Sequence, residues 1–149
     1  MRTRITPLCP PTPFRLHERD DGQGGSKSVT ENPTWNGIAA AIGRLDNESF
    51  TDVSIEYGEG ADATNMLVSG GRDERVVCCV ARPDDPGWGQ DFRHVVDREW
   101  RQGTFEQVIG GQESDLPAML SVPRETALQA ARYFVEHRAL DPELDWKIP

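Results

Sequence analysis

Paired carboxylates are the side chains best suited to chemistry in this chain, because acid–base catalysis needs two acids whose pKa values are held apart in one cleft. Asp84 and Asp85 form the most compact pair. Prolines bound the segment 83–87 that contains them, and aspartate is favoured in such turns for backbone hydrogen bonding and hydration. The pattern therefore favours a solvated turn over a catalytic dyad. The same ambiguity applies to other carboxylates, namely Asp97, Glu99, Glu113 and Asp115.

Histidines and cysteines show no spacing typical of a metal site or an activated nucleophile. The three histidines are scattered, and none stands at metal-ligand spacing from another histidine or a cysteine. Cys78 and Cys79 are adjacent, so on a strand they would point to opposite faces and would not readily bond each other. With Cys9 the cysteine count is odd, which favours reduced thiols in the cytosol. We expect no metal and no cofactor.

Two glycine-rich segments superficially resemble nucleotide-binding loops. Segment 22–28 (GQGGSKS) lacks the glycines that a phosphate loop needs and has Asp21 and Ser26 in their places, so we expect a flexible linker. Segment 58–63 (GEGADA) fits G-x-G-x-x-A, but the next predicted strand follows too soon for a helix that would hold a pyrophosphate. We expect a hairpin loop there, and no catalytic constellation emerges.

The charge balance excludes whole classes of partner. The chain has 149 residues, with 16 Lys+Arg against 25 Asp+Glu and a net charge of −9. Such a protein is poorly suited to nucleic acid or to an anionic membrane surface and is better suited to a basic partner. No segment approaches the ~20 apolar residues that span a bilayer, and residues 1–13 lack the apolar run of a secretory signal. These features predict a cytoplasmic protein.

Two tryptophans stand in polar surroundings. Trp88 lies beside the glycine- and proline-rich turn, and Trp100 lies among charged residues. Exposed aromatic side chains framed by charge are typical anchors of protein–protein contacts. Packing of each indole on the core is the alternative.

Composition predicts a boundary near residue 33. Residues 1–33 contain five prolines, a glycine run and few apolar side chains, so we expect a flexible, disordered leader. Residues 34–149 contain 11 Lys+Arg and 21 Asp+Glu, a net charge of −10, and are expected to form one folded domain.

The hydrophobic periodicity predicts two helices with short strands between them. Asn32 and Pro33 resemble a helix cap and first turn, before an apolar stripe that ends near Asp46. A second helix is expected from residue 125 to about 136. Strands are expected at 53–57, 66–68, 75–80, 93–97 and 104–109, while 116–122 could be strand or irregular. The linkers are too short for parallel crossovers, so we predict an α+β fold with a mainly antiparallel sheet flanked by an N-terminal and a C-terminal helix.

The segment 108–146 resembles immunity protein family 1 of bacterial polymorphic toxin systems. That family shows a glycine pair followed by glutamine, then a proline, a long helix with an aromatic residue near its end, and a tail that closes in tryptophan. The resemblance extends over roughly residues 35–146, but His137 and Arg138 stand where the family often turns through glycine, and residues 1–33 have no counterpart. The matching positions are Trp35, Gly70, Gly71, Trp88, Gly110, Gly111, Gln112, Pro117, Phe134 and Trp146.

This resemblance implies a non-enzymatic cytosolic antidote that binds and blocks a cognate toxin, often one of the deaminase superfamily. We expect the four glycines at 70, 71, 110 and 111 to end strands, because glycine permits positive φ, and we expect Trp35, Phe134 and Trp146 to lie in the core. The residues that we expect to contact the toxin are Asp84, Asp85, Trp88, Glu113 and Asp115. Two alternatives stay open: an adaptor domain that binds basic segments of other proteins, and a small carboxylate-dependent enzyme.

Overall fold

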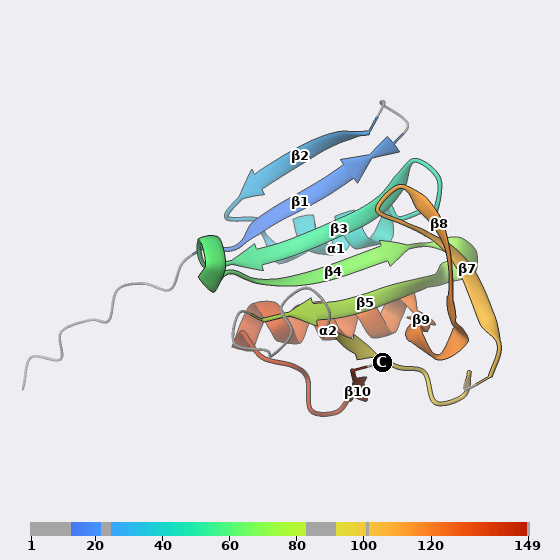
Figure 1. Cartoon of the computed structure of the whole chain (residues 1–149). Coiled ribbons are helices and arrows are strands. Elements are labelled where there is room, and N and C mark those ends of the chain that lie inside the picture. Colours follow the sequence, from blue (N-terminus) through green and yellow to red (C-terminus); the bar gives the residue numbers. More distant parts are fainter. Residues whose placement is uncertain (1–12, 22–24, 83–91, 101, 149) are drawn as a thin grey trace, which may run out of the picture.

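One antiparallel sheet of eight strands crosses the molecule, as a computed structural model of residues 13–21, 25–82, 92–100 and 102–148 shows (Figure 1). The strands follow the order β10-β6-β5-β4-β3-β1-β2, and β9 pairs with β5 beside β6. They are β1 (Arg15–Asp20), β2 (Ser26–Glu31), β3 (Phe50–Tyr57), β4 (Thr64–Gly70), β5 (Arg75–Ala81), β6 (Arg93–Val95), β9 (Ser121–Pro123) and β10 (Trp146–Lys147). The predicted α+β class and antiparallel sheet are confirmed.

Two helices cover one face of this sheet, and a separate hairpin crosses the other (Figure 1). The helices are α1 (Trp35–Gly43) and α2 (Arg124–His137), and the hairpin strands are β7 (Thr104–Ile109) and β8 (Gln112–Pro117). Short 3₁₀ turns occupy Gly60–Asp62, Arg72–Glu74 and Ala118–Leu120. No helix in the described part of the chain is long and apolar enough to cross a bilayer.

The core lies between the helices and the sheet. Strand periodicity brings alternate residues of β3, β4 and β5 to the helix side, where they meet the apolar stripes of α1 and α2. Phe134 is 1% exposed in this core, while Trp35 and Trp146 are half-buried and pack against it. Cys78 and Cys79 are buried free thiols, and burial raises the pKa of Cys79 to about 12. Both are therefore unreactive packing residues.

The first helix begins two residues later than its sequence indicates. Thr34, not Asn32, is the N-cap, because its hydroxyl accepts a hydrogen bond from the Gly37 N–H at 3.1 Å. Asn32 has a positive φ of 50°, and its N–H donates to the Phe14 carbonyl at 3.0 Å. Asn32 thus continues the ladder between β1 and β2, and Pro33 only leads into the cap.

Prediction of a flexible leader over residues 1–33 is wrong for residues 13–21 and 25–33, while residues 1–12 lie outside the part of the chain that the structure describes. β1 pairs with β2 on one side and β3 on the other, and Leu16 is 3% exposed in the core. The supposed linker 22–28 runs into β2 at Ser26. Composition concealed these strands because β1 has only one fully buried residue and β2 has none. Backbone hydrogen bonds to neighbouring strands, and not buried side chains, hold them in place. The domain therefore begins before residue 34.

Replacing Leu16 with alanine is expected to lower the free energy of unfolding by about 2–4 kcal/mol, because the change removes buried methyl groups and leaves a cavity. Urea denaturation measures this effect. The matched control is Ser28→Ala on the adjacent strand β2, where the side chain is exposed and the expected change is below about 0.5 kcal/mol. Equal, small effects of the two changes would show that β1 is not part of the cooperative unit.

Candidate functional site

The hairpin β7–β8 contains Glu113 and Asp115, two of the residues expected to contact a partner. Gly110 and Gly111 form its turn with positive φ values of 60° and 77°, the conformation that two-residue hairpin turns need. The strands pair from Ile109↔Gln112 to Thr104↔Pro117. β7 lies against β3 and β4 on the sheet face that the helices leave open.

Hydrogen bonds fix the hairpin on the body of the domain. The Val108 N–H donates to Asn47 Oδ1 at 2.7 Å, and the Gly110 N–H donates to Asp52 Oδ1 at 2.9 Å. Gln107 is 1% exposed, and its Nε2 lies 2.9 Å from Ser121 Oγ. A Cβ added at Gly70 would lie 2.8 Å from Gln107 Cδ, so the glycine makes room for this side chain. The hairpin is therefore held in one position.

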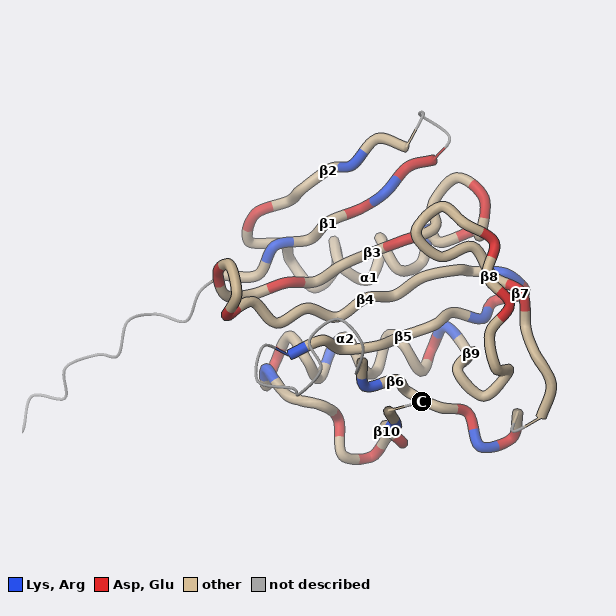
Figure 2. The backbone as a smooth tube through the Cα atoms, viewed as in Figure 1, with Lys and Arg blue, Asp and Glu red and all other residues tan. Residues whose placement is uncertain are grey.

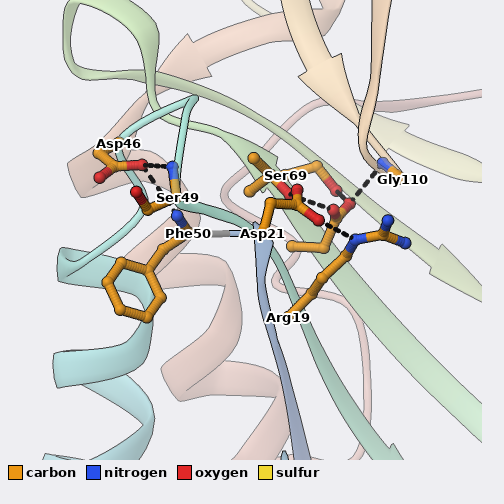
Figure 3. A network of polar contacts seen from close by, with 9 residues as sticks. Arg19, Asp21, Asp46, Ser49, Phe50, Ser69 and Gly110 are labelled. Atoms are coloured by element: carbon orange, nitrogen blue, oxygen red, sulfur yellow. Dashed lines mark hydrogen bonds and ion pairs between the residues drawn. The ribbon is translucent and has the colours of Figure 1, made fainter. Parts of the chain in front are cut away.

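A polar network lies under the tip of the hairpin (Figure 3). Arg19 Nε donates to Asp21 Oδ1 at 2.7 Å, and the Thr51 hydroxyl lies 2.8 Å from Asp21 Oδ2. Asp52 accepts from the Ser69 hydroxyl at 2.9 Å as well as from the Gly110 N–H. The hydrogen bonds from Arg19 and Thr51 hold the pKa of Asp21 below its ordinary value of 3.8.

Acidification is expected to remove the stabilisation that Asp21 provides. Because its folded pKa is lowered, the stabilising effect is fully present above the ordinary value of 3.8 and is lost as pH falls through the folded pKa. We therefore expect Asp21→Asn to lower Tm by about 2–4 °C at pH 7, with this difference shrinking as the pH falls below 3.8. Thermal unfolding at several pH values measures it. Asp62→Asn in the β3–β4 loop is the control, and an equal pH profile for both variants would contradict the prediction.

The outer side of the hairpin is acidic. Strand alternation turns Phe105 and Gln107 toward the sheet and three carboxylates outward, and Figure 2 shows these charges along both strands. Glu106 stands directly opposite Asp115 in the ladder, although like charges at opposed positions destabilise a sheet. Only the guanidinium of Arg72, 3.7 Å from Glu106 Oε2, offsets this repulsion among the ion pairs of the described residues. We call Glu106, Glu113 and Asp115 the acidic hairpin face.

Sequence reasoning identified two of these three residues. Glu113 and Asp115 are both exposed on β8, two residues apart and on one face. Glu106 was missed, because its position opposite Asp115 follows from the register of the β7–β8 hairpin and no strand was expected over residues 112–115. The other expected contact residues, Asp84, Asp85 and Trp88, lie outside the residues that the structure describes.

Trp100 is held next to the hairpin with part of its indole in solvent. Its ring lies 3.8 Å from the guanidinium carbon of Arg75 and packs edge-to-face on Phe105, yet the residue is 39% exposed. The Arg75 guanidinium is fixed in turn by Asp97 Oδ2 at 2.6 Å. An indole fixed on one side has little side-chain entropy left to lose when another surface packs on its exposed part.

A shallow concavity of about 300 Å³ lies beside the hairpin tip on the open sheet face. Residues of both charges line it, including Arg19, Lys27, Asp52 and Glu56. Within the described ranges no three His, Cys, Asp or Glu side chains are grouped so that they could hold a metal ion.

A model of a known protein family matches most of the chain. The family model described as "Immunity protein Imm1" matches residues 27–147, which extend from β2 through β10 and include the hairpin and Trp100. No curated protein matches the chain.

Proposed function

We propose that this chain, which belongs to the Imm1 family of immunity proteins, binds a cognate polymorphic toxin domain and blocks it by occluding the toxin's active site. The family match over residues 27–147 is the observation that carries this proposal. On this proposal the chain acts by binding and not by catalysis, in the cytoplasm of the cell that makes it.

The acidic hairpin face and Trp100 are the surface that we assign to the toxin. An interface of ordinary size covers about 1,600 Å² and gains most of its affinity from a few central anchors. Trp100 provides an aromatic anchor, and Phe105 connects it to the strand that carries Glu106. Asp84, Asp85 and Trp88 remain predicted contacts of the same kind.

A toxin that acts on nucleic acid fits this surface best. Such an enzyme must present a basic cleft that attracts phosphates. Three carboxylates on a rigid hairpin can occupy that cleft in place of the phosphate backbone, and the net charge of −9 steers the two proteins together. Within this class we propose a deaminase, following the family that the sequence resembles.

Co-expression of this chain with the toxin domain encoded next to its gene tests the immunity role. We expect cells to survive when both proteins are present and the two to co-purify as a stable complex. Death of cells that contain both proteins would contradict the assignment. Weak, salt-sensitive binding to many unrelated basic proteins would favour an adaptor domain instead.

Competition distinguishes occlusion from remote inhibition. Purified toxin with its preferred nucleic-acid substrate should release that substrate when this chain is added, and inhibition should be complete at a one-to-one ratio. Simultaneous binding of substrate and this chain would show that the active site is not covered.

A further inference from the structure

The outermost strand of the sheet, β2, has an unpaired edge. β2 is last in the strand order, and among the described residues only β1 pairs with it (Figure 1). All six of its residues are exposed, so it contributes no buried side chain to the core. Natural proteins usually protect such edges with proline, a bulge or several charges, because unpaired N–H and C=O groups are a template for another strand. β2 contains no proline, its ladder with β1 runs without a register shift, and its two charges, Lys27 and Glu31, are of opposite sign.

The register of β1 and β2 determines which backbone groups face outward. The Asn32 N–H donates to the Phe14 carbonyl, and this pair continues the register that places Arg15 opposite Glu31. Antiparallel ladders alternate between hydrogen-bonded and non-hydrogen-bonded pairs. The backbone N–H and C=O groups of every second residue before Asn32 therefore face β1. The groups that face away from β1 are those of Lys27, Val29 and Glu31.

These three residues can pair with the same three residues of a second copy of the chain. In an antiparallel pair of two β2 strands centred on Val29, each Val29 stands opposite its copy, and each Lys27 stands opposite a Glu31. All three pairs use outward-facing groups, so each can form two backbone hydrogen bonds. Opposite charges directly across a ladder stabilise it, and this register provides such a pair twice. A register shifted by two residues loses both pairs.

Two features of the single chain support the same register. Lys27 stands opposite Arg19 in β1, a like-charge pair that a carboxylate from a second copy would offset. Val29 is 52% exposed, the largest exposed fraction among the large hydrophobic residues that the structure describes. Pairing about Val29 would cover this side chain with its own copy.

We propose that β2 is a dimerisation strand, which joins two copies of this chain into one continuous antiparallel sheet. The partner is a second copy of this chain, because the charges of β2 are complementary to those of another β2 strand that runs in the opposite direction. Contact through one strand is smaller than the roughly 1,200 Å² of standard interfaces, so the dimer is weak and depends on concentration. This inference goes beyond the proposed function and does not depend on the identity of a toxin.

Charge reversal and mixing test the proposal by sedimentation velocity from micromolar to millimolar protein. The wild-type mass should rise from 16.6 kDa toward twice that value. Lys27→Glu and Glu31→Lys should each weaken dimerisation at least tenfold, because each places like charges together twice. An equimolar mixture of the two variants should form a dimer, because every Glu then meets a Lys. The double variant K27E/E31K should dimerise like wild type.

Val29→Pro gives an independent test of the backbone pairing. Its N–H faces away from β1, so proline removes no bond of the β1–β2 ladder but blocks the central pair of the dimer. We expect a monomer with a Tm close to wild type. A monomeric wild type at millimolar concentration, or a mixture of charge variants that stays monomeric, would overturn the proposal. If the wild type is monomeric and Val29→Pro weakens toxin binding, the edge instead accepts a strand of the toxin.

Discussion

Alanine at Gly71 is expected to lower the free energy of unfolding by about 3–5 kcal/mol, because backbone strain and steric overlap add at this position. Gly71 has a φ of +112°, which side chains rarely adopt. An added Cβ would overlap the Leu45 carbonyl and lie 2.8 Å from the Asp46 nitrogen. Both obstacles are backbone, so no side-chain rotation can relieve them.

The segments that meet at Gly71 explain why such strain cannot relax locally. The Gly71 N–H donates to the Arg75 carbonyl at 3.0 Å, which shapes the turn from β4 to β5. Arg124, the first residue of α2, donates from Nη1 to the Ile42 carbonyl at 2.6 Å and from Nη2 to the Leu45 carbonyl at 2.8 Å. These bonds satisfy carbonyls at the end of α1. A displaced Leu45 therefore shifts both helices relative to the sheet.

Urea denaturation and thermal unfolding measure this prediction, with a fall in Tm of about 10 °C or more. Gly43→Ala is the matched control. Gly43 ends α1 without a positive φ, and an added Cβ there meets nothing within 4 Å. Alanine at position 43 should leave stability unchanged or raise it by up to about 1 kcal/mol. A loss of less than 1 kcal/mol for Gly71→Ala would show that the turn adapts to a side chain.

Elements with strong hydrophobic periodicity were predictable from the sequence. The predicted strands 53–57, 66–68 and 75–80 lie inside β3, β4 and β5, and 104–109 coincides with β7. β5 has five consecutive buried residues, as its apolar run indicated. Both helices formed where an apolar stripe recurs with helical spacing. In each case the core needs apolar side chains at regular positions, and this need produces the hydrophobic periodicity of the sequence.

Strands that depend on pairing instead of burial were not predictable. β1 and β2 fell within the expected leader, and β8 was only partly covered by the uncertain segment 116–122. β8 has no fully buried residue, so its sequence lacks the alternation of a core strand. Segment 93–97 is strand only to Val95, because the Asp97 N–H donates to the Met119 carbonyl outside the sheet ladder.

The candidate surface shows the same division. Carboxylates at 113 and 115 could be identified from residue type, but their grouping with Glu106 depends on the hairpin register. The orientation of Trp100 depends on Arg75, which is 25 positions earlier and approaches only because β5 and the loop after β6 are neighbours in space. Such long-range pairings leave no local periodic pattern in a single sequence.

Exchange of Glu113 and Asp115 for lysine is expected to weaken toxin binding about a hundredfold or more, through slower association and loss of contacts with the toxin's basic cleft. Both side chains are exposed, so the stability of the fold should not fall, and removal of the carboxylate opposite Glu106 relieves a repulsive pair. Surface plasmon resonance at several salt concentrations measures the effect. The salt dependence of association should be much smaller for the variant, because its steering charges are reversed.

The control for this change is Glu125→Lys with Glu136→Lys, which alters the net charge equally on α2, on the opposite face of the sheet. Long-range steering by total charge would weaken binding similarly for both double variants, whereas a local contact weakens it only for the hairpin variant. Addition of Trp100→Ala to the hairpin variant decides whether Trp100 and the carboxylates belong to one interface. The losses in binding free energy are non-additive for neighbouring contacts and additive for distant ones. Unchanged affinity for the hairpin variant would exclude the acidic hairpin face from the interface and leave the family assignment intact.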